Sequence, residues 1–330
     1  MPSPRRGART NVDIERLKRL HGTMLRVRAS EAALAKLFAD GEIPGFIHLS
    51  LGQEAVAAGV CAALDGRDTL ATTHRGHGHV IARGMDLDDF FKELMGRAGG
   101  KCGGRSGSMH VADMSLGILG ANGIVGASVP LALGSAIAHQ TRRTGGVAVA
   151  FFGDGAMAEG GLHEALNMAA LWKLPLLLVC ENNGWSEFSP TERQFRGTLE
   201  GLAKTFGIAH RRVDGNDVEA TVAAADEAVA HARTDGPYIL ECMTSRVRGH
   251  NEGDAQKYRD SAELQGPPAK DPIARCAGRL SELGVGESEL AALSSAVDAA
   301  VSAAVDAARA DALPDFDAAF ADVYSRGEVR

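Results

Sequence analysis

The chain has 330 residues, of which 45% are hydrophobic and 23% charged, an ordinary balance for a globular protein. Its formal net charge is −7, which argues against nucleic acid or an anionic membrane as a general partner. The longest apolar run, 174–180, contains Pro175 and is too short to cross a bilayer. The five cysteines are scattered, and residues 1–10 lack the apolar region of a secretory signal, so we expect a cytoplasmic protein with reduced thiols.

The N-terminal half is predicted to begin with helices and continue into glycine-rich loops. The polar, basic residues 1–12 predict a disordered head, and residues 13–330 a single domain. Apolar residues recur at helical spacing over 11–40. The segments that follow are predicted to be a loop over 41–54, a helix over 54–63, a short strand over 68–73 and an irregular segment over 96–107, which holds six glycines.

The C-terminal half alternates between strand and helix patterns. Three continuous apolar runs predict strands that are covered on both faces, at 147–152, 174–180 and 237–243. Strands that alternate with amphipathic helices are typical of an α/β fold, a doubly wound, mostly parallel sheet with helices on both faces. The polar segment 246–266 predicts a long mobile loop, and a helical C-terminal region follows from Pro272.

The first of these strands leads into the sequence GDGAMA, residues 153–158. Its spacing, GxGxxA, is found in dinucleotide-binding loops, and an NAD-dependent dehydrogenase is one interpretation. Asp154, however, would repel a pyrophosphate unless a divalent cation lay between them. Mg²⁺ takes about six oxygen ligands, commonly from one or two protein groups together with phosphate oxygens. A second ligand is therefore expected at the end of the neighbouring strand, where residues 181–185 read ENNGW.

GDG followed by this NN pair resembles the motif that binds thiamine diphosphate. Over about residues 15–325 the chain is similar to the α subunit of the E1 component of 2-oxo acid dehydrogenase complexes. Five further motifs carry the resemblance in the family's order: HLSLGQEA (48–55), THRGHG (73–78), GGRSGSMH (103–110), GANGIVGASVPLALG (120–134) and RGHNEGDAQKYR (248–259). The resemblance implies the diphosphate-binding half of a thiamine diphosphate enzyme.

The resemblance also implies roles for individual positions. Asp154, Asn183 and the carbonyl of Trp185 would bind Mg²⁺. The other cofactor contacts would come from His74, Arg75, Gly123, Val125, Gly155, Ala156 and His250. His48 and His250 would be the catalytic histidines, since the pKa range of imidazole suits proton transfer near neutrality.

The segment 249–258, GHNEGDAQKY, resembles the acetoin dehydrogenase α subunits within this family. Glu252 and Asp254 are candidates for acetoin recognition, while Ser128 and Asn251 depart from the pattern of the pyruvate enzymes. A pyruvate or branched-chain 2-oxo acid dehydrogenase α subunit is the alternative. By resemblance, a separate β subunit supplies the glutamate that activates thiamine diphosphate, in an α₂β₂ heterotetramer. A lipoyl-bearing E2 acyltransferase would accept the acetyl group.

Overall fold

The computed structural model describes residues 13–260 and 270–317. A six-stranded sheet in the order β2-β1-β3-β4-β8-β7 forms its centre, and every neighbouring pair of strands is parallel. Its strands are β1 (Thr69–Ala71), β2 (Ile118–Gly120), β3 (Ala148–Gly153), β4 (Leu176–Asn182), β7 (Ala209–Asp214) and β8 (Tyr238–Met243). The predicted head at 1–12 and the last part of the predicted mobile loop, 261–266, lie outside the described residues.

Successive side chains of the central strands enter two separate cores, one on each face of the sheet. On β3, Val149 and Phe151 belong to one core, and Ala148, Ala150 and Phe152 to the other. This alternation follows from the period of two in a strand. Because both sides are buried, the strand is apolar throughout, which is why a continuous run predicted it correctly.

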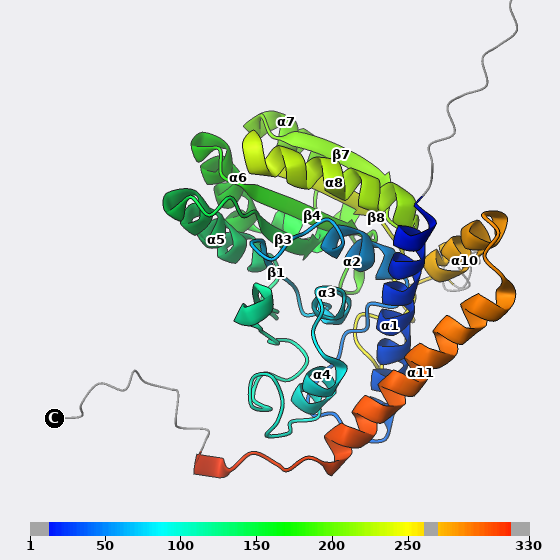
Figure 1. Ribbon diagram of the computed structural model, residues 1–330. Coiled ribbons are helices and arrows are strands. Elements are labelled where there is room, and N and C mark those ends of the chain that lie inside the picture. The colour runs from blue at the N-terminus through cyan, green and yellow to red at the C-terminus, as the bar shows by residue number, and fades with distance from the viewer. Residues whose placement is uncertain (1–12, 261–269, 318–330) are drawn as a thin grey trace, which may run out of the picture.

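Helices cover both faces, as Figure 1 shows. One face packs against α5 (Ser128–Arg142), α6 (Gly160–Trp172) and α7 (Leu199–Phe206). The opposite core is built from α1 (Ile14–Ala39), α2 (Glu54–Cys61), α3 (His77–Ala82), α4 (Leu87–Leu94), α8 (Val218–Thr234) and α11 (Glu287–Ala310), and α10 (Pro272–Glu282) packs beside α1 and α2. The prediction of a doubly wound α/β fold is confirmed.

One strand of the sheet carries no apolar pattern in the sequence. β7 reads AHRRVD and pairs only with β8 among the described residues. Arg211 bonds Glu227, and Arg212 bonds Glu241 at 2.8 Å, so the arginines of this strand are used in ion pairs. An edge strand with exposed charges is a common way to prevent edge-to-edge association, and it hides the strand from a search for apolar runs.

The helix α11 is long and apolar enough, by length and composition, to cross a membrane, with a mean hydropathy of 1.4. A single helix of this kind is weak support for a membrane protein. Its buried side chains, among them Val301, Val305 and Ala308, belong to the same core as α1 and α4.

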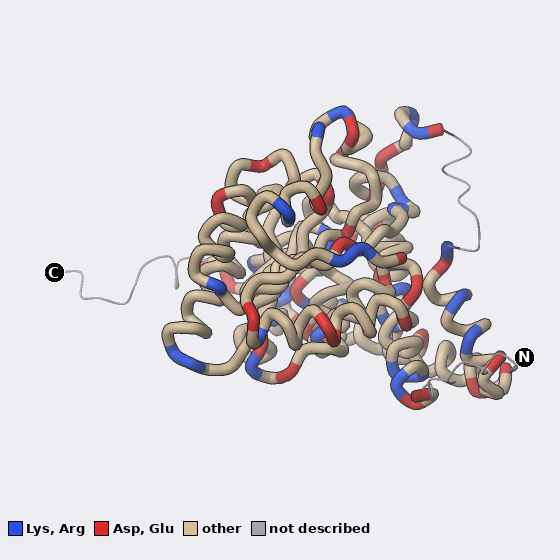
Figure 2. The backbone as a smooth tube through the Cα atoms, turned by 90° about the horizontal axis from the view of Figure 1, so that it is seen from above, with Lys and Arg blue, Asp and Glu red and all other residues tan. Residues whose placement is uncertain are grey.

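Basic and acidic residues are interspersed over the described chain rather than gathered by sign (Figure 2).

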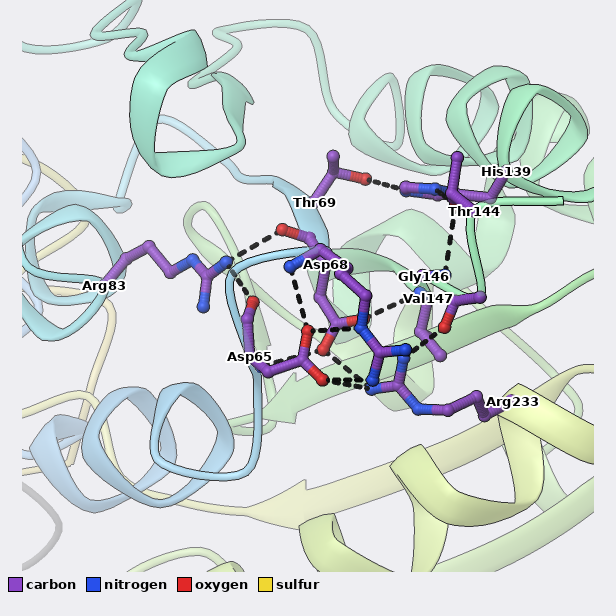
Figure 3. Close-up of polar contacts among 11 residues, drawn as sticks. Asp65, Asp68, Thr69, Arg83, His139, Thr144, Gly146, Val147 and Arg233 are labelled. Carbon is purple, nitrogen blue, oxygen red and sulfur yellow. Dashed lines mark hydrogen bonds and ion pairs between the residues drawn. The ribbon is translucent and has the colours of Figure 1, made fainter. Parts of the chain in front are cut away.

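Asp68, just before β1, organises the amino-terminal edge of the sheet (Figure 3). Its buried carboxylate accepts hydrogen bonds from the backbone N–H of Val147 at 2.8 Å and of Asp65 at 2.9 Å. Arg233 on α8 pairs with the same carboxylate at 2.9 Å. These contacts of the Asp68 carboxylate connect β1, β3 and α8. Arg83 adds hydrogen bonds to the backbone carbonyls of Asp65 and Asp68.

We expect Asp68→Asn to lower the free energy of unfolding by about 2 kcal/mol, because an amide cannot pair with Arg233 and presents a donor to a donor. Asp65→Asn is the matched control. Its side chain is largely exposed, and its ion pairs should contribute less than about 1 kcal/mol. Urea unfolding of the two variants would measure the difference, and equal losses would contradict the role given to Asp68.

Candidate active site

A cavity of about 350 Å³ opens at the carboxyl-terminal ends of the central strands. Thr72 and Thr73 line it directly after β1, Gly153 at the end of β3, and Glu181 near the end of β4. Ligands of open α/β sheets bind at this edge of the strands. The volume suits a small organic molecule or cofactor.

The residues predicted to bind the cofactor or the metal ion, or to act in catalysis, all line this cavity. They come from segments that are far apart in the chain and that the topology brings to one edge of the sheet: His48, His74, Arg75, Gly123, Val125, Asp154, Gly155, Ala156, Asn183, Trp185 and His250. The fold thus gathers these residues around a single cavity.

Asp154 begins the short 3-10 turn Asp154–Ala158 that links β3 to α6. The residue is only 1% exposed. Its carboxylate accepts hydrogen bonds from the backbone N–H of Asn183, at 3.2 Å, and from the Thr191 hydroxyl. No Lys, Arg or His forms a salt bridge with it in the part of the chain that the structure describes. Burial raises its pKa and outweighs those hydrogen bonds and the charge of Arg246, as is typical of a desolvated carboxylate.

Asn183 lies beside Asp154, just beyond β4, and its side chain joins two loops. The amide nitrogen donates to Gln53 Oε1 at 3.1 Å, and the amide oxygen accepts the N–H of Trp185 at 3.1 Å. Trp185 starts the small antiparallel pair of β5 (Trp185–Ser186) and β6 (Ser189–Pro190). A Cβ on Gly155 would lie 2.5 Å from Ser186 Oγ, so glycine is needed for this hairpin to approach the turn.

Arg75 is buried below the cavity and connects two of its walls. Its guanidinium donates to the carbonyl of Leu49 at 2.6 Å and to the carbonyl of His250 at 2.8 Å. Burial, reinforced by the charge of Arg246, lowers its pKa to about 10. The side chain therefore stays cationic near neutral pH, at a place where an anionic group of a ligand could be bound.

Three imidazoles lie together at the cavity wall. The ring centroids of His48 and His74 are 4.6 Å apart, those of His48 and His250 4.9 Å, and those of His74 and His250 5.5 Å. Burial, followed by the nearby charge of Arg75, lowers the pKa of His48 to about 3 and that of His250 to about 4. The pKa of His74 is lowered well below its usual value for the same reasons. All three rings are therefore neutral at physiological pH.

The structure adds polar groups that the sequence did not single out. Gln53 bonds Asn183, Thr191 bonds Asp154, and Arg246 lines the cavity with its side chain buried. Glu181 also lines the cavity and pairs with His79 at 3.2 Å. Arg246 could have been found, since it follows β8 at the same carboxyl edge.

Neither candidate for acetoin recognition lines the cavity. Asp254 accepts hydrogen bonds from the backbone N–H of His250 at 2.8 Å and from the Tyr258 hydroxyl at 2.5 Å. Glu252 pairs with Arg248 at 3.6 Å. In the described part of the loop, Asp254 thus fixes the backbone around His250, and a role of the two acids in acetoin recognition stays a prediction.

A family model described as "Dehydrogenase E1 component" matches residues 22–316. The chain belongs to this family. The α subunit of an acetoin:2,6-dichlorophenolindophenol oxidoreductase from Bacillus subtilis is 48% identical over 74% of each chain, and its counterpart from Cupriavidus necator 42% over 95% of each. The α subunit of the pyruvate dehydrogenase E1 component of Rhizobium meliloti is 41% identical over 91% of this chain and 87% of its own.

Membership of the E1 family confirms the resemblance carried by the sequence motifs. The protein is an oxidoreductase of the E1 type, and the family implies dependence on thiamine diphosphate. The dinucleotide-binding interpretation of residues 153–158 is therefore set aside. The residues at the cavity fit this cofactor, because a buried carboxylate with no salt-bridge partner in the described part of the chain, an amide and a buried arginine converge there.

Proposed function

We propose that this chain is the α subunit of a cytoplasmic, Mg²⁺-dependent E1 enzyme that cleaves acetoin and transfers the acetyl group to a lipoyl-bearing E2 acyltransferase. Two relatives named for acetoin oxidation share 48% and 42% of the aligned residues, and one of them aligns over 95% of this chain. We choose acetoin as the substrate because of this similarity. Pyruvate is the second candidate, because a pyruvate dehydrogenase α subunit is 41% identical over 91% of the chain.

In this proposal Mg²⁺ is bound by Asp154, Asn183 and the carbonyl of Trp185. The burial of Asp154 without a salt-bridge partner among the described residues supports the assignment, since a divalent cation would neutralise it. The backbone N–H groups of Gly155 and Ala156, at the turn after β3, would donate to the diphosphate. Arg75 and His74 would contact the same anion from the opposite loop, and Gly123 and Val125 would support the organic part.

When bound, thiamine diphosphate would supply a carbon nucleophile for the substrate carbonyl and a group able to delocalise negative charge. The chain's own contribution is orientation and proton transfer. His48 and His250 are neutral, so each can donate through one ring nitrogen and accept through the other. They would orient the substrate hydroxyl and move its proton as the carbon–carbon bond of acetoin is cleaved.

A β subunit is proposed to complete the site. Large apolar side chains are exposed beside the cavity, where a partner surface would cover them: Ile124 is 73% exposed, Val125 46% and Phe188 51%. Ile124 and Val125 line the cavity itself, and the ring of Phe188 lies 5.8 Å from that of His250. Exposed apolar patches of this kind are typical of protein–protein interfaces.

The test is reconstitution of the α chain with its β subunit, thiamine diphosphate and Mg²⁺, followed by reduction of a dye or of a lipoyl domain. Acetoin should give a kcat/KM at least about tenfold above that of pyruvate, a difference of about 1.4 kcal/mol in the barrier. The α chain alone should be inactive. A higher kcat/KM for pyruvate than for acetoin would make pyruvate the substrate. Full activity of the α chain without the β subunit would contradict an active site completed by both subunits.

A further inference from the structure

Gln53 lines the cavity from the start of α2, and the residue is only 2% exposed. It occupies the N-cap position of this helix but makes no side-chain hydrogen bond to it. Helices prefer Ser, Thr, Asp or Asn at that position, because their short side chains satisfy the first backbone N–H groups. The side chain of Gln53 instead reaches across to the end of β4, where its Oε1 accepts from Asn183 Nδ2 at 3.1 Å.

The backbone that carries Gln53 is held against the segment after β8. Gly52 has a φ of +94°, and a Cβ on it would lie 2.5 Å from the carbonyl oxygen of Ser245. Its own carbonyl accepts from the Thr244 hydroxyl at 3.2 Å, and its N–H donates to the buried carboxylate of Glu54. Gln53 therefore extends from a fixed loop and can hold a neighbouring side chain in one orientation.

The contact with Gln53 determines which way the amide of Asn183 faces. An amide carries two N–H donors on one side and an oxygen acceptor on the other. With its nitrogen bound to Gln53, the amide oxygen of Asn183 accepts the N–H of Trp185 at 3.1 Å. A carbonyl oxygen has two lone pairs, so one of them stays available for a cation. The reverse orientation would present N–H donors to Mg²⁺, which binds oxygen atoms.

We propose that Gln53 is a positioning residue of the metal site, which holds the amide of Asn183 with its oxygen available to Mg²⁺. This inference rests on the proposed role of Asn183 as a Mg²⁺ ligand. Gln53 acts through Asn183 and is not itself a ligand. Partners that orient a metal ligand in this way typically change metal affinity by about 10–100-fold when they are replaced.

The test measures how much Mg²⁺ the protein needs to bind its cofactor. Calorimetry of thiamine diphosphate binding to the α chain with its β subunit, over a series of Mg²⁺ concentrations, gives the concentration for half-maximal binding. Gln53→Met removes the acceptor and should raise that concentration at least about tenfold. Gln53→Glu keeps an acceptor oxygen and should raise it by at most about threefold. Gln140→Met is the matched control, because the amide of Gln140 bonds only backbone carbonyls at the end of α6 among the described residues.

A double-mutant cycle shows whether Gln53 acts through Asn183. Asn183→Ala alone should raise the required Mg²⁺ concentration at least about tenfold, and adding Gln53→Met to it should change that value by less than about threefold. Circular dichroism would verify that each variant is folded.

The inference is overturned if Gln53→Met needs no more Mg²⁺ than the unaltered protein, or if Gln53→Glu loses as much affinity as Gln53→Met. It is equally overturned if Gln140→Met has the same effect as Gln53→Met, or if the effects of Gln53→Met and Asn183→Ala add in full. In each of these cases a loss of Mg²⁺ affinity in Asn183→Ala leaves the proposed metal site standing. A normal Mg²⁺ requirement of Asn183→Ala would overturn both the ligand assignment and this inference.

Discussion

Replacement of Asp154 by alanine should lower the affinity of the protein for thiamine diphosphate in the presence of Mg²⁺ by at least about 100-fold. Even side chains that only orient a ligand of a metal change metal affinity by about 10–100-fold, so loss of a direct ligand should reach the upper end of that range or exceed it. Calorimetry of the α chain together with its β subunit, with and without Mg²⁺, measures the effect. Activity should fall in parallel.

Asp68→Asn is the matched control for this experiment. Asp68 and Asp154 are both 1% exposed, but they lie at opposite ends of the sheet, before β1 and after β3 respectively. The Asp68 variant should lose stability and keep its cofactor affinity where it remains folded. An Asp154→Ala protein that still bound the cofactor within about threefold of the unaltered protein would contradict the Mg²⁺ assignment.

Asp154→Ala should have little effect on the stability of the chain when no cofactor is bound. Burial raises the pKa of Asp154, which means that the ionised carboxylate is held there at a cost. Its hydrogen bonds with Asn183 and Thr191 offset part of that cost. We expect the free energy of unfolding without cofactor to fall by no more than about 1 kcal/mol. A loss of affinity without a comparable loss of stability is typical of a residue retained for function.

The sequence predicted those strands whose own residues are apolar because both of their faces are buried. The strands at 147–152, 174–180 and 237–243 correspond to β3, β4 and β8, each within about two residues at its ends. β7 was missed because it is a charged edge strand whose pairing with β8 is not encoded in an apolar pattern. Propensity and periodicity report burial, so an element stabilised by ion pairs at an edge escapes both.

The site was predictable where a motif sits on a loop and unpredictable where a role depends on a partner far along the chain. Asp154 and Asn183 were predicted together because Mg²⁺ is commonly bound by one or two protein groups, which neighbouring strand ends can supply. Gln53 was missed, since its contact with Asn183 spans 130 positions. Asp254 was a candidate for acetoin recognition from its motif alone, and its hydrogen bonds to the backbone and the tyrosine of its own loop could not be read from that motif.

One buried carboxylate, that of Glu31, bonds side chains that lie close in sequence to residues of the cavity lining. Glu31 on α1 is fully buried and accepts hydrogen bonds from the backbone N–H of Ser50 at 2.9 Å and from its hydroxyl at 2.6 Å. It also bonds His77 Nδ1 at 3.0 Å, and His77 Nε2 bonds the Ser108 hydroxyl at 2.8 Å. Ser50 is two residues from His48, so the network fixes a proposed catalytic residue.

Glu31→Ala should therefore lower the free energy of unfolding by about 3–5 kcal/mol, because it leaves Ser50 and His77 buried without their acceptor. Glu31→Gln should lower it by only about 1–2 kcal/mol. The amide oxygen can still accept from Ser50, so only the contact with His77 loses its acceptor. Glu15→Gln, an exposed acid on the same helix, should change it by less than about 0.5 kcal/mol.

The pH dependence of the unfolding free energy shows whether Glu31 acts as an ionised carboxylate or as a neutral polar group. Burial alone would raise the pKa of Glu31, but the charge of His77 and the hydrogen bonds from His77 and Ser50 outweigh it, so the pKa is lowered. A folded-state pKa below that of the unfolded chain gives stability that is complete above the unfolded value of about 4.3 and is lost as the pH falls through the folded value. The difference in unfolding free energy between the unaltered chain and Glu31→Gln should accordingly be larger at about pH 7 than at about pH 3.5. A difference that grew on acidification would mean that Glu31 is held in its neutral form, and the network would then act through hydrogen bonding without charge.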